Sequence, residues 1–119
     1  MKSRSGQYIM VFMTCGKKRE AEAIAKELLR ARHAACVGIY PKGDSLYWWK
    51  GVMERSREYL VIAKTKAFAL NALIAAVKRI HGYDVPEIVA LPIIGGNRDY
   101  LKWLDGEVSS GRRKRCAKE

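Results

Sequence analysis

The sequence has few of the features that mark cross-linked, zinc-stabilised or membrane-spanning proteins. Among its 119 residues are three cysteines, Cys15, Cys36 and Cys116, and none of them forms a CxxC pair. The odd number argues against a disulfide framework, and the spacing does not indicate a structural zinc site. Apart from the N-terminal run that includes residues 8–15, the longest uncharged run, at 67–77, is too short to span a bilayer. We therefore expect a soluble protein of the cytoplasm without a membrane partner.

Residues that could carry out enzyme chemistry are also scarce. The chain has two histidines, His33 and His81, and it has no GxSxG, HExxH or P-loop motif. Acylphosphatases use an arginine in a phosphate-binding loop after the first strand, and the basic segment 15–19 is a poor match to that pattern. We therefore predict that the protein is not an enzyme and that it uses no organic cofactor.

The net charge of +11 raises the question of nucleic-acid binding. Six of these eleven charges lie at the two ends of the chain, in residues 1–6 and 112–119. A basic tail can bind nucleic acid through nonspecific electrostatics, or it can be a solvated segment that aids solubility. RNA-recognition domains need exposed aromatic side chains after a Lys-Gly pair on the third strand, and residues 52–54 provide none after Lys50-Gly51. We expect a solvated tail, and any contact with nucleic acid would be nonspecific and through this tail.

Hydrophobic patterning predicts one domain of alternating strands and helices. Residues 8–14 and 59–64 are apolar without polar alternation, as is typical of strands covered on both faces. Thr65 is expected to cap the second helix and Gly82 to end it. In chain order, the predicted elements are a strand at 8–14, a helix at 18–32, a strand at 35–49 with a bulge or turn at 41–44, a strand at 59–64 after a hairpin corner at 50–51, a helix at 66–81, a strand at 88–93 and a short helix at 97–108.

This order is βαββαβ with an additional C-terminal helix, the ferredoxin-like arrangement of the α+β class. Two right-handed crossovers place both main helices on one face of an antiparallel sheet. The strands at 8–14 and 59–63 are nevertheless apolar on both faces, so the second face must also be covered. The C-terminal helix can cover a part of it. The aromatic stretch Tyr47, Trp48 and Trp49 predicts that other subunits cover the remainder.

Three stretches of the sequence resemble the signature segments of the CutA divalent-cation tolerance family: LLRARHAACVGIYPKGDSLYWWKG (28–51), HGYDVPEIVALPI (81–93) and YLKWL (100–104). The resemblance extends in order from about Tyr8 to Leu104. It implies a fold similar to that of the PII signalling proteins and a tight homotrimer formed by sheet pairing between chains, which agrees with the two-faced strands. We expect residues 1–6 to be a disordered N-terminus, 7–108 to form the ferredoxin-like CutA domain and 109–119 to be a basic, disordered tail.

The resemblance also implies candidate metal ligands. Carried over by position, these are Cys36, from the Ala-Ala-Cys stretch, and His81, from the His-x-Tyr-x-x-Pro-Glu stretch. Met13 stands where some members have a cysteine, and Cys15 should point to the same face of the strand. Thiolate, imidazole and thioether groups suit copper or zinc. Structural interpretations stay open as well, with Cys36 as a small buried hydrophobe and His81 as a group favoured by the dipole at a helix end.

Two positions depart from the family pattern. Lys50 stands where many relatives carry a glutamate, so it removes an oxygen ligand and places a cation there. Gly82 replaces the proline that is usual between the histidine and the tyrosine, which loosens that corner.

Taken together, the resemblance predicts a trimeric protein of divalent-cation (copper or zinc) binding and tolerance. The alternative is a PII-like trimer that senses a small ligand or signals without direct metal binding. Its ligand cleft between subunits would be lined by Lys64, Tyr83, Glu87, Tyr100 and Trp103, which combine polar and aromatic groups. A structural trimer without a ligand is a third interpretation.

Overall fold

A computed structural model of the chain describes the backbone of residues 7–117 and the side chains of residues 7–108. The predicted disordered N-terminus, residues 1–6, lies outside the described residues, as do residues 118–119. The elements follow in chain order as β1 (Tyr8–Cys15), α1 (Lys18–Arg30), β2 (Cys36–Trp49), β3 (Val52–Lys66), the 3-10 helix η2 (Ala67–Ala69), α2 (Leu70–Ile80), β4 (Ile88–Pro92) and α3 (Arg98–Ala117).

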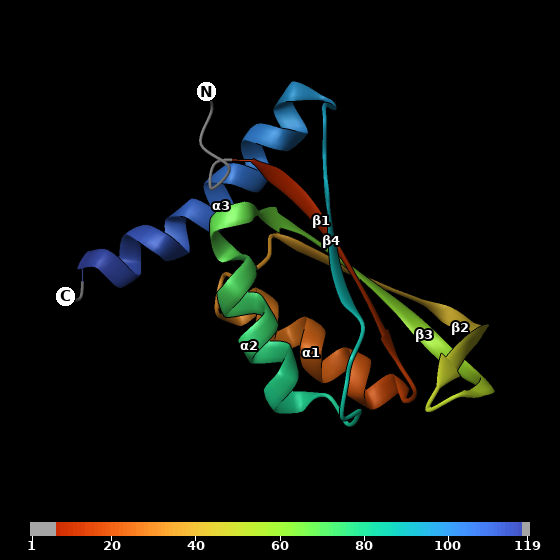
Figure 1. Cartoon of the computed structure of the whole chain (residues 1–119). Helices are drawn as coiled ribbons and strands as arrows, with labels where there is room; N and C mark the ends of the chain where they lie inside the picture. The colour runs from red at the N-terminus through yellow and green to blue at the C-terminus, as the bar shows by residue number, and fades with distance from the viewer. Residues whose placement is uncertain (1–6, 118–119) are drawn as a thin grey trace.

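The four strands form one antiparallel sheet in the order β2-β3-β1-β4. Helices α1 and α2 lie side by side against one face of this sheet (Figure 1). The arrangement confirms the predicted α+β class and the ferredoxin-like βαββαβ order with an additional C-terminal helix. Among the described residues, no helix is both long enough and apolar enough to cross a membrane.

Strand β1 lies in the middle of the sheet and alternates strictly between its two faces. Ile9, Val11, Met13 and Cys15 are at most 5% exposed, and they point to the face that α1 and α2 cover, here called the helix face. Their partners in the core come from both helices and from β3, with Ala21, Ile24, Leu28, Val61, Ala63, Leu73, Ala76 and Val77 among them. Burial of these aliphatic side chains is the main stabilising contribution to the fold.

The other face of the sheet, here called the open face, is apolar but only half covered. Met10, Phe12 and Ile62 on this face are partly exposed, and Val89 and Leu91 of β4 are each 48% exposed. Helix α3 covers one end of it, where its residues Leu104 and Val108 pack against Ala69 and Tyr8. The two-faced character predicted from the sequence is confirmed, and the single chain leaves the centre of the open face without cover.

Strands β2 and β3 form a hairpin that projects beyond the helices (Figure 1). The register shifts between Tyr40 and Gly43, so the predicted interruption at 41–44 is a β-bulge within one long strand. Lys50 and Gly51 form the corner with φ angles of 50° and 80°. Positive φ at both central residues matches the right-handed twist of a two-residue hairpin turn, which confirms the predicted corner.

Of the two predicted helix caps, Thr65 is wrong and Asn97 is confirmed. Thr65 does not cap the second helix, because its hydroxyl donates instead to the carbonyl oxygen of His33 at 2.7 Å while the strand continues to Lys66. The helical segment then begins as the 3-10 turn η2, without a side-chain cap. Asn97 does cap α3, since its side-chain oxygen accepts a hydrogen bond from the Asp99 backbone N–H at 3.0 Å.

Helix α3 is longer than the sequence pattern indicated. The predicted helix ended near Val108, whereas the structure continues it to Ala117, through most of the segment 109–119 expected to be a disordered tail. After Val108 the sequence has no apolar residue until Cys116, so hydrophobic periodicity could not report the extension. Lys and Arg are good helix formers and suit a helix C-terminus, which is consistent with the longer helix.

Candidate functional site

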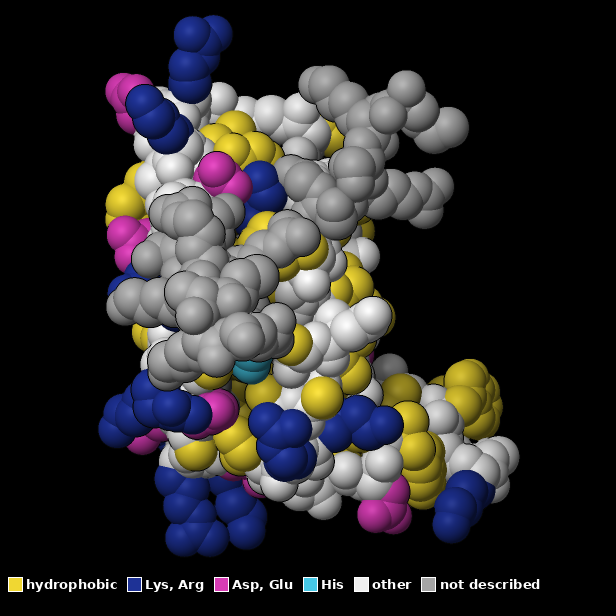
Figure 2. All heavy atoms as spheres, turned by 90° about the vertical axis from the view of Figure 1, so that its left-hand side faces the viewer, with side chains coloured by type: hydrophobic (Ala, Val, Ile, Leu, Met, Phe, Trp, Pro, Cys, Tyr) yellow, Lys and Arg dark blue, Asp and Glu magenta, His cyan; other side chains and the backbone are white. Residues whose placement is uncertain are grey.

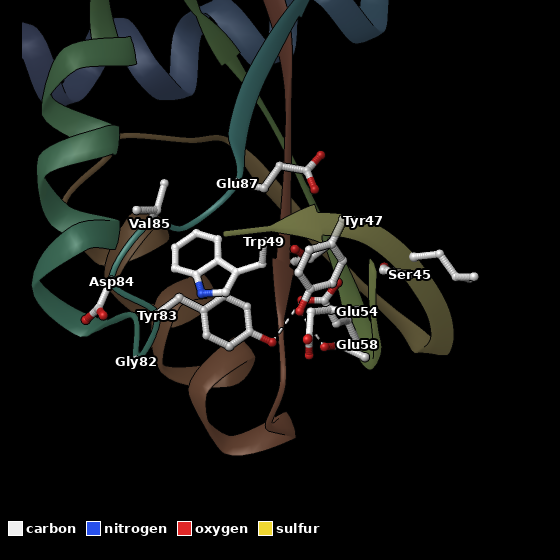
Figure 3. A pocket seen from close by; sticks show the side chains of 13 residues that line it. Ser45, Tyr47, Trp49, Glu54, Glu58, Gly82, Tyr83, Asp84, Val85 and Glu87 are labelled. Atoms are coloured by element: carbon white, nitrogen blue, oxygen red, sulfur yellow. Dashed lines mark hydrogen bonds between the residues drawn. The ribbon is translucent and has the colours of Figure 1, made fainter. Parts of the chain in front are cut away.

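A cleft of about 760 Å³ opens between the β2–β3 hairpin and the loop that joins α2 to β4. Figure 3 shows Tyr47, Glu54 and Glu58 of the hairpin on one side and Tyr83, Asp84 and Val85 of the loop on the other. The residues that line it are Thr14, Ser45, Leu46, Tyr47, Trp49, Glu54, Ser56, Glu58, Gly82, Tyr83, Asp84, Val85 and Glu87. Such a volume is typical of sites for small molecules.

Strand register places the hairpin side chains on one wall. Tyr47 pairs with Glu54 and Ser45 with Ser56, so these residues share a face, and Glu58 follows two positions after Ser56. The hydroxyl groups of Tyr47 and Ser56 are hydrogen-bonded at 2.7 Å. This wall is therefore fixed by the sheet itself and presents polar groups toward the loop.

The opposite wall is held to the hairpin by one hydrogen bond. The Tyr83 hydroxyl donates to Glu58 Oε2 at 2.8 Å (Figure 3). Burial raises the pKa of Tyr83 well above its usual range, and the hydrogen bond to Glu58 adds to this effect. The phenol therefore stays protonated and remains a donor, and Glu58, which is only 8% exposed, keeps a partner for its carboxylate.

The cleft is acidic. Four carboxylates, Glu54, Glu58, Asp84 and Glu87, belong to its lining, and none of the described lining residues is Lys or Arg. The outer face of the helices differs, since Figure 2 shows Lys and Arg side chains gathered along its lower edge. Because like charges gathered in a concave site raise the local concentration of counter-ions, the cleft should attract cations although the whole chain is basic.

A buried group of metal-ligand side chains lies next to the loop wall of the cleft. One ligand atom each of Cys15, Glu20 and His81 lies within 4.8 Å of the other two. His81 Nε2 donates to the Thr14 carbonyl oxygen at 2.6 Å, and Nδ1 accepts the Tyr83 backbone N–H at 3.1 Å. These bonds fix the neutral tautomer with the proton on Nε2, and Nδ1 faces Glu20 Oε1 at 3.5 Å.

The thiol of Cys15 is expected to resist alkylation in the native, metal-free protein. Burial, followed by the charges of Glu20 and Glu58, raises the pKa of Cys15 to about 12. At pH 8 about one thiol in ten thousand is then ionised, and the thiolate is the reactive form. Peptide mapping after brief iodoacetamide treatment should find Cys15 unmodified in the native protein and modified after denaturation. Rapid native modification at pH 8 would contradict this environment.

The three predicted metal ligands do not meet within one chain. Met13 lies in the core on the helix face, whereas Cys36 pairs with Lys64, whose partner Met10 lies on the open face. His81 contacts the chain at Thr14, four residues from Met10, which is about 13 Å along a strand. The structure therefore brings His81 together with Cys15 and Glu20, whereas Cys36 lies apart from His81 and on the opposite face of the sheet from Met13.

The five predicted cleft residues divide into two groups. Tyr83 and Glu87 line the cleft. Lys64, Tyr100 and Trp103 lie together at the other end of the open face, with Lys64 Nζ 5.6 Å from the Tyr100 ring centroid and the Tyr100 and Trp103 rings 5.5 Å apart. Sequence reasoning missed three acidic residues of the lining, Glu54, Glu58 and Asp84. For the two glutamates a signal was present, because Glu54, Ser56 and Glu58 alternate along one strand and therefore share a face.

The predicted interface residues lie on both faces of the projecting hairpin. Tyr47 and Trp49 face the cleft and are about 40% exposed, while Trp48 points to the opposite face and is 70% exposed. Trp48 pairs with Met53, and Leu46, two positions before Trp48 in the strand, also borders the cleft; Leu46 and Met53 are each 61% exposed. Large apolar side chains are rarely so exposed together unless another surface covers them.

Comparison with known protein families gives one match over most of the chain. The family model described as CutA1 divalent ion tolerance protein matches residues 9–107. The Divalent-cation tolerance protein CutA of Thermus thermophilus is 46% identical over 95 residues, which cover 80% of this chain and 92% of the relative. Protein CutA 1, chloroplastic, of rice is 45% identical over 96 residues and 81% of this chain, but the match spans only 54% of the rice protein.

The fold is also similar to solved structures. The periplasmic divalent cation tolerance protein CutA from Archaeoglobus fulgidus matches with a TM-score of 0.82 and 37% identity. The match covers 85% of this chain and 98% of that one. The cleft and the buried Cys15, Glu20 and His81 group both lie within the matched family segment.

Proposed function

The chain belongs to the CutA1 divalent ion tolerance family, and from this premise we propose that it is a non-enzymatic homotrimer that binds divalent cations such as copper or zinc. The observation that carries the proposal is the acidic cleft, whose lining contains four carboxylates and no Lys or Arg among the described residues. Carboxylate oxygens bind hard and borderline divalent cations, and a concave acidic wall concentrates them. The expected location in the cytoplasm stays a prediction.

The trimer is supported by the apolar surface that one chain leaves open. The hairpin exposes Leu46, Trp48 and Met53, and the edge strand β4 exposes Val89 and Leu91. An edge strand carries unpaired backbone donors and acceptors, which makes it a template for pairing with another chain. Pairing between identical chains would cover the open face and the hairpin at once, and a closed ring leaves no edge free.

A second function, recognition of a small organic ligand without direct metal binding, is favoured by the aromatic walls of the cleft. Tyr47, Trp49 and Tyr83 line it together with the carboxylates, and its volume suits a small molecule. The acidic lining favours a cationic ligand over an anionic one, since an anion would be repelled. A zinc titration separates the two functions, because the second one predicts no saturable heat with the metal.

Removing cleft charge is expected to weaken cation binding at least about tenfold. The test variant combines Glu54→Gln, Asp84→Asn and Glu87→Gln, and it keeps Glu58 because that residue holds Tyr83. Calorimetric titration of the metal-free protein with zinc and with copper measures the affinity.

A matched control carries three neutralised carboxylates outside the cleft, Glu22→Gln, Glu27→Gln and Asp99→Asn. This control should keep the affinity of the unmodified chain, since its changes remove the same formal charge at a distance from the lining. Equal affinity in both triple variants would reject the cleft as the site, and absence of saturable binding by the unmodified chain would reject the function.

A further inference from the structure

Three different metal-ligand groups converge beside the cleft from three separate elements. Cys15 is the last residue of β1, Glu20 lies in the first turn of α1, and His81 follows the last residue of α2. Their side chains are buried or nearly so, with His81 at 0% and Glu20 at 17% side-chain exposure. A thiol, an imidazole and a carboxylate brought together out of solvent form a mixed sulfur, nitrogen and oxygen donor set.

The imidazole is already oriented as a metal-ligating histidine usually is. Such a histidine binds the metal through one ring nitrogen and donates the N–H of the other to a carbonyl or carboxylate, which fixes the ring orientation and the tautomer. His81 Nε2 donates to the Thr14 carbonyl oxygen at 2.6 Å, so the lone pair lies on Nδ1, on the side where Glu20 Oε1 is 3.5 Å away. A nitrogen and an oxygen bound to one tetrahedral zinc ion stand at a similar separation.

Gly82 makes room for the carboxylate. A Cβ atom at this position would lie 3.0 Å from Glu20 Oε2, closer than side chains normally approach. The residue that departs from the family pattern therefore lets Glu20 lie against the turn that carries His81. The turn at His81 and Gly82 and the first turn of α1 therefore pack against each other at the Glu20 carboxylate.

We propose that Cys15, Glu20 and His81 form an inner site for zinc or a similar borderline divalent cation, reached from the acidic cleft. The inference rests on the proposed cation-binding function and adds to it the three side chains that hold the ion. Zinc accepts sulfur, nitrogen and oxygen ligands in a tetrahedral arrangement, and a three-ligand site leaves its fourth position to water.

Binding involves two local changes. The S–H bond of Cys15 breaks, its proton passes to solvent, and the thiolate sulfur forms a bond to the ion. The Tyr83 backbone N–H gives up its hydrogen bond to His81 Nδ1, and the ion takes that lone pair. Glu20 and Glu58 lie close enough to act on the Cys15 thiol, so a dication placed there is stabilised by their charges.

Cobalt(II), a zinc surrogate with a visible spectrum, tests the inner site directly. The metal-free protein is titrated with cobalt(II), and thiolate-to-cobalt charge transfer in the near ultraviolet reports a cysteine ligand. The spectrum should appear in the unmodified chain and in Cys36→Ser, the cysteine that the sequence indicated as a ligand. It should be lost in Cys15→Ser, and Glu20→Gln, an isosteric change at a partly exposed group, should weaken cobalt binding at least about tenfold.

The outcomes separate this inference from the function on which it rests. Charge transfer that persists in Cys15→Ser, or that disappears in Cys36→Ser, overturns the inner site. Saturable heat with zinc in the unmodified chain but no charge transfer with cobalt also overturns it and leaves the cleft as the cation site. Absence of both signals in the unmodified chain rejects the proposed function together with the inference, and this result does not depend on whether any variant folds.

Discussion

Trp48→Glu is expected to convert the proposed trimer into monomers. Trp48 is 70% exposed in the single chain and forms an apolar patch with Met53 and Leu46 on one face of the hairpin. A buried tryptophan at the centre of an interface is commonly worth about 2–4 kcal/mol, and the change occurs in every interface of a closed ring. A carboxylate at this position would also be buried without a partner. Light scattering after size-exclusion chromatography measures the mass.

Leu29→Glu serves as the control for Trp48→Glu. Leu29 is also an exposed apolar residue, at 42%, but it lies on α1 on the far side of the sheet from the open face. This variant should keep the mass of the unmodified protein. A trimer that survives Trp48→Glu would show that the hairpin face does not form the interface.

Leu28→Ala is expected to lower the free energy of unfolding by about 3 kcal/mol, within a range of about 2–5 kcal/mol. Leu28 has no exposed surface and belongs to the core between α1 and the sheet. Truncation loses its transfer free energy and leaves a cavity that surrounding strands of the sheet cannot fill. Urea or guanidinium unfolding at a fixed protein concentration measures the change.

The neighbouring residue provides a matched control for that truncation. Leu29→Ala removes the same atoms from the same helix, yet Leu29 is 42% exposed, so the expected loss is under about 1 kcal/mol. Similar losses in the two variants would contradict the assignment of Leu28 to the core and Leu29 to the surface of α1.

The sequence predicted much of the fold because its signals are local. Continuous apolar residues identified β1 as a strand that is apolar on both faces, and residues 50–51 marked the hairpin corner that the φ angles confirm. Thr65 was assigned wrongly as a cap because a residue type that favours caps can equally bond across the fold, here to the His33 carbonyl. Capping preference alone does not identify the partner.

The site was predicted less completely, because its residues meet through tertiary structure. The family resemblance indicated Tyr83 and Glu87, which line the cleft, and His81, which lies beside it. The pairing of His81 with Cys15 and Glu20 depends on how α1 and the end of α2 pack against β1. Strand register alone separates Cys36 from Met13, because the two point to opposite faces of the sheet. That register is not visible in one sequence without the partner strand.

A zinc titration of the unmodified, metal-free protein, followed by heat and by subunit mass in the same series, measures cation binding and assembly together. We expect a trimer before and after the addition of zinc, with saturable binding that the cleft triple variant weakens. A monomer throughout, or heat that never saturates, would contradict the claim that this chain binds divalent cations as a trimer.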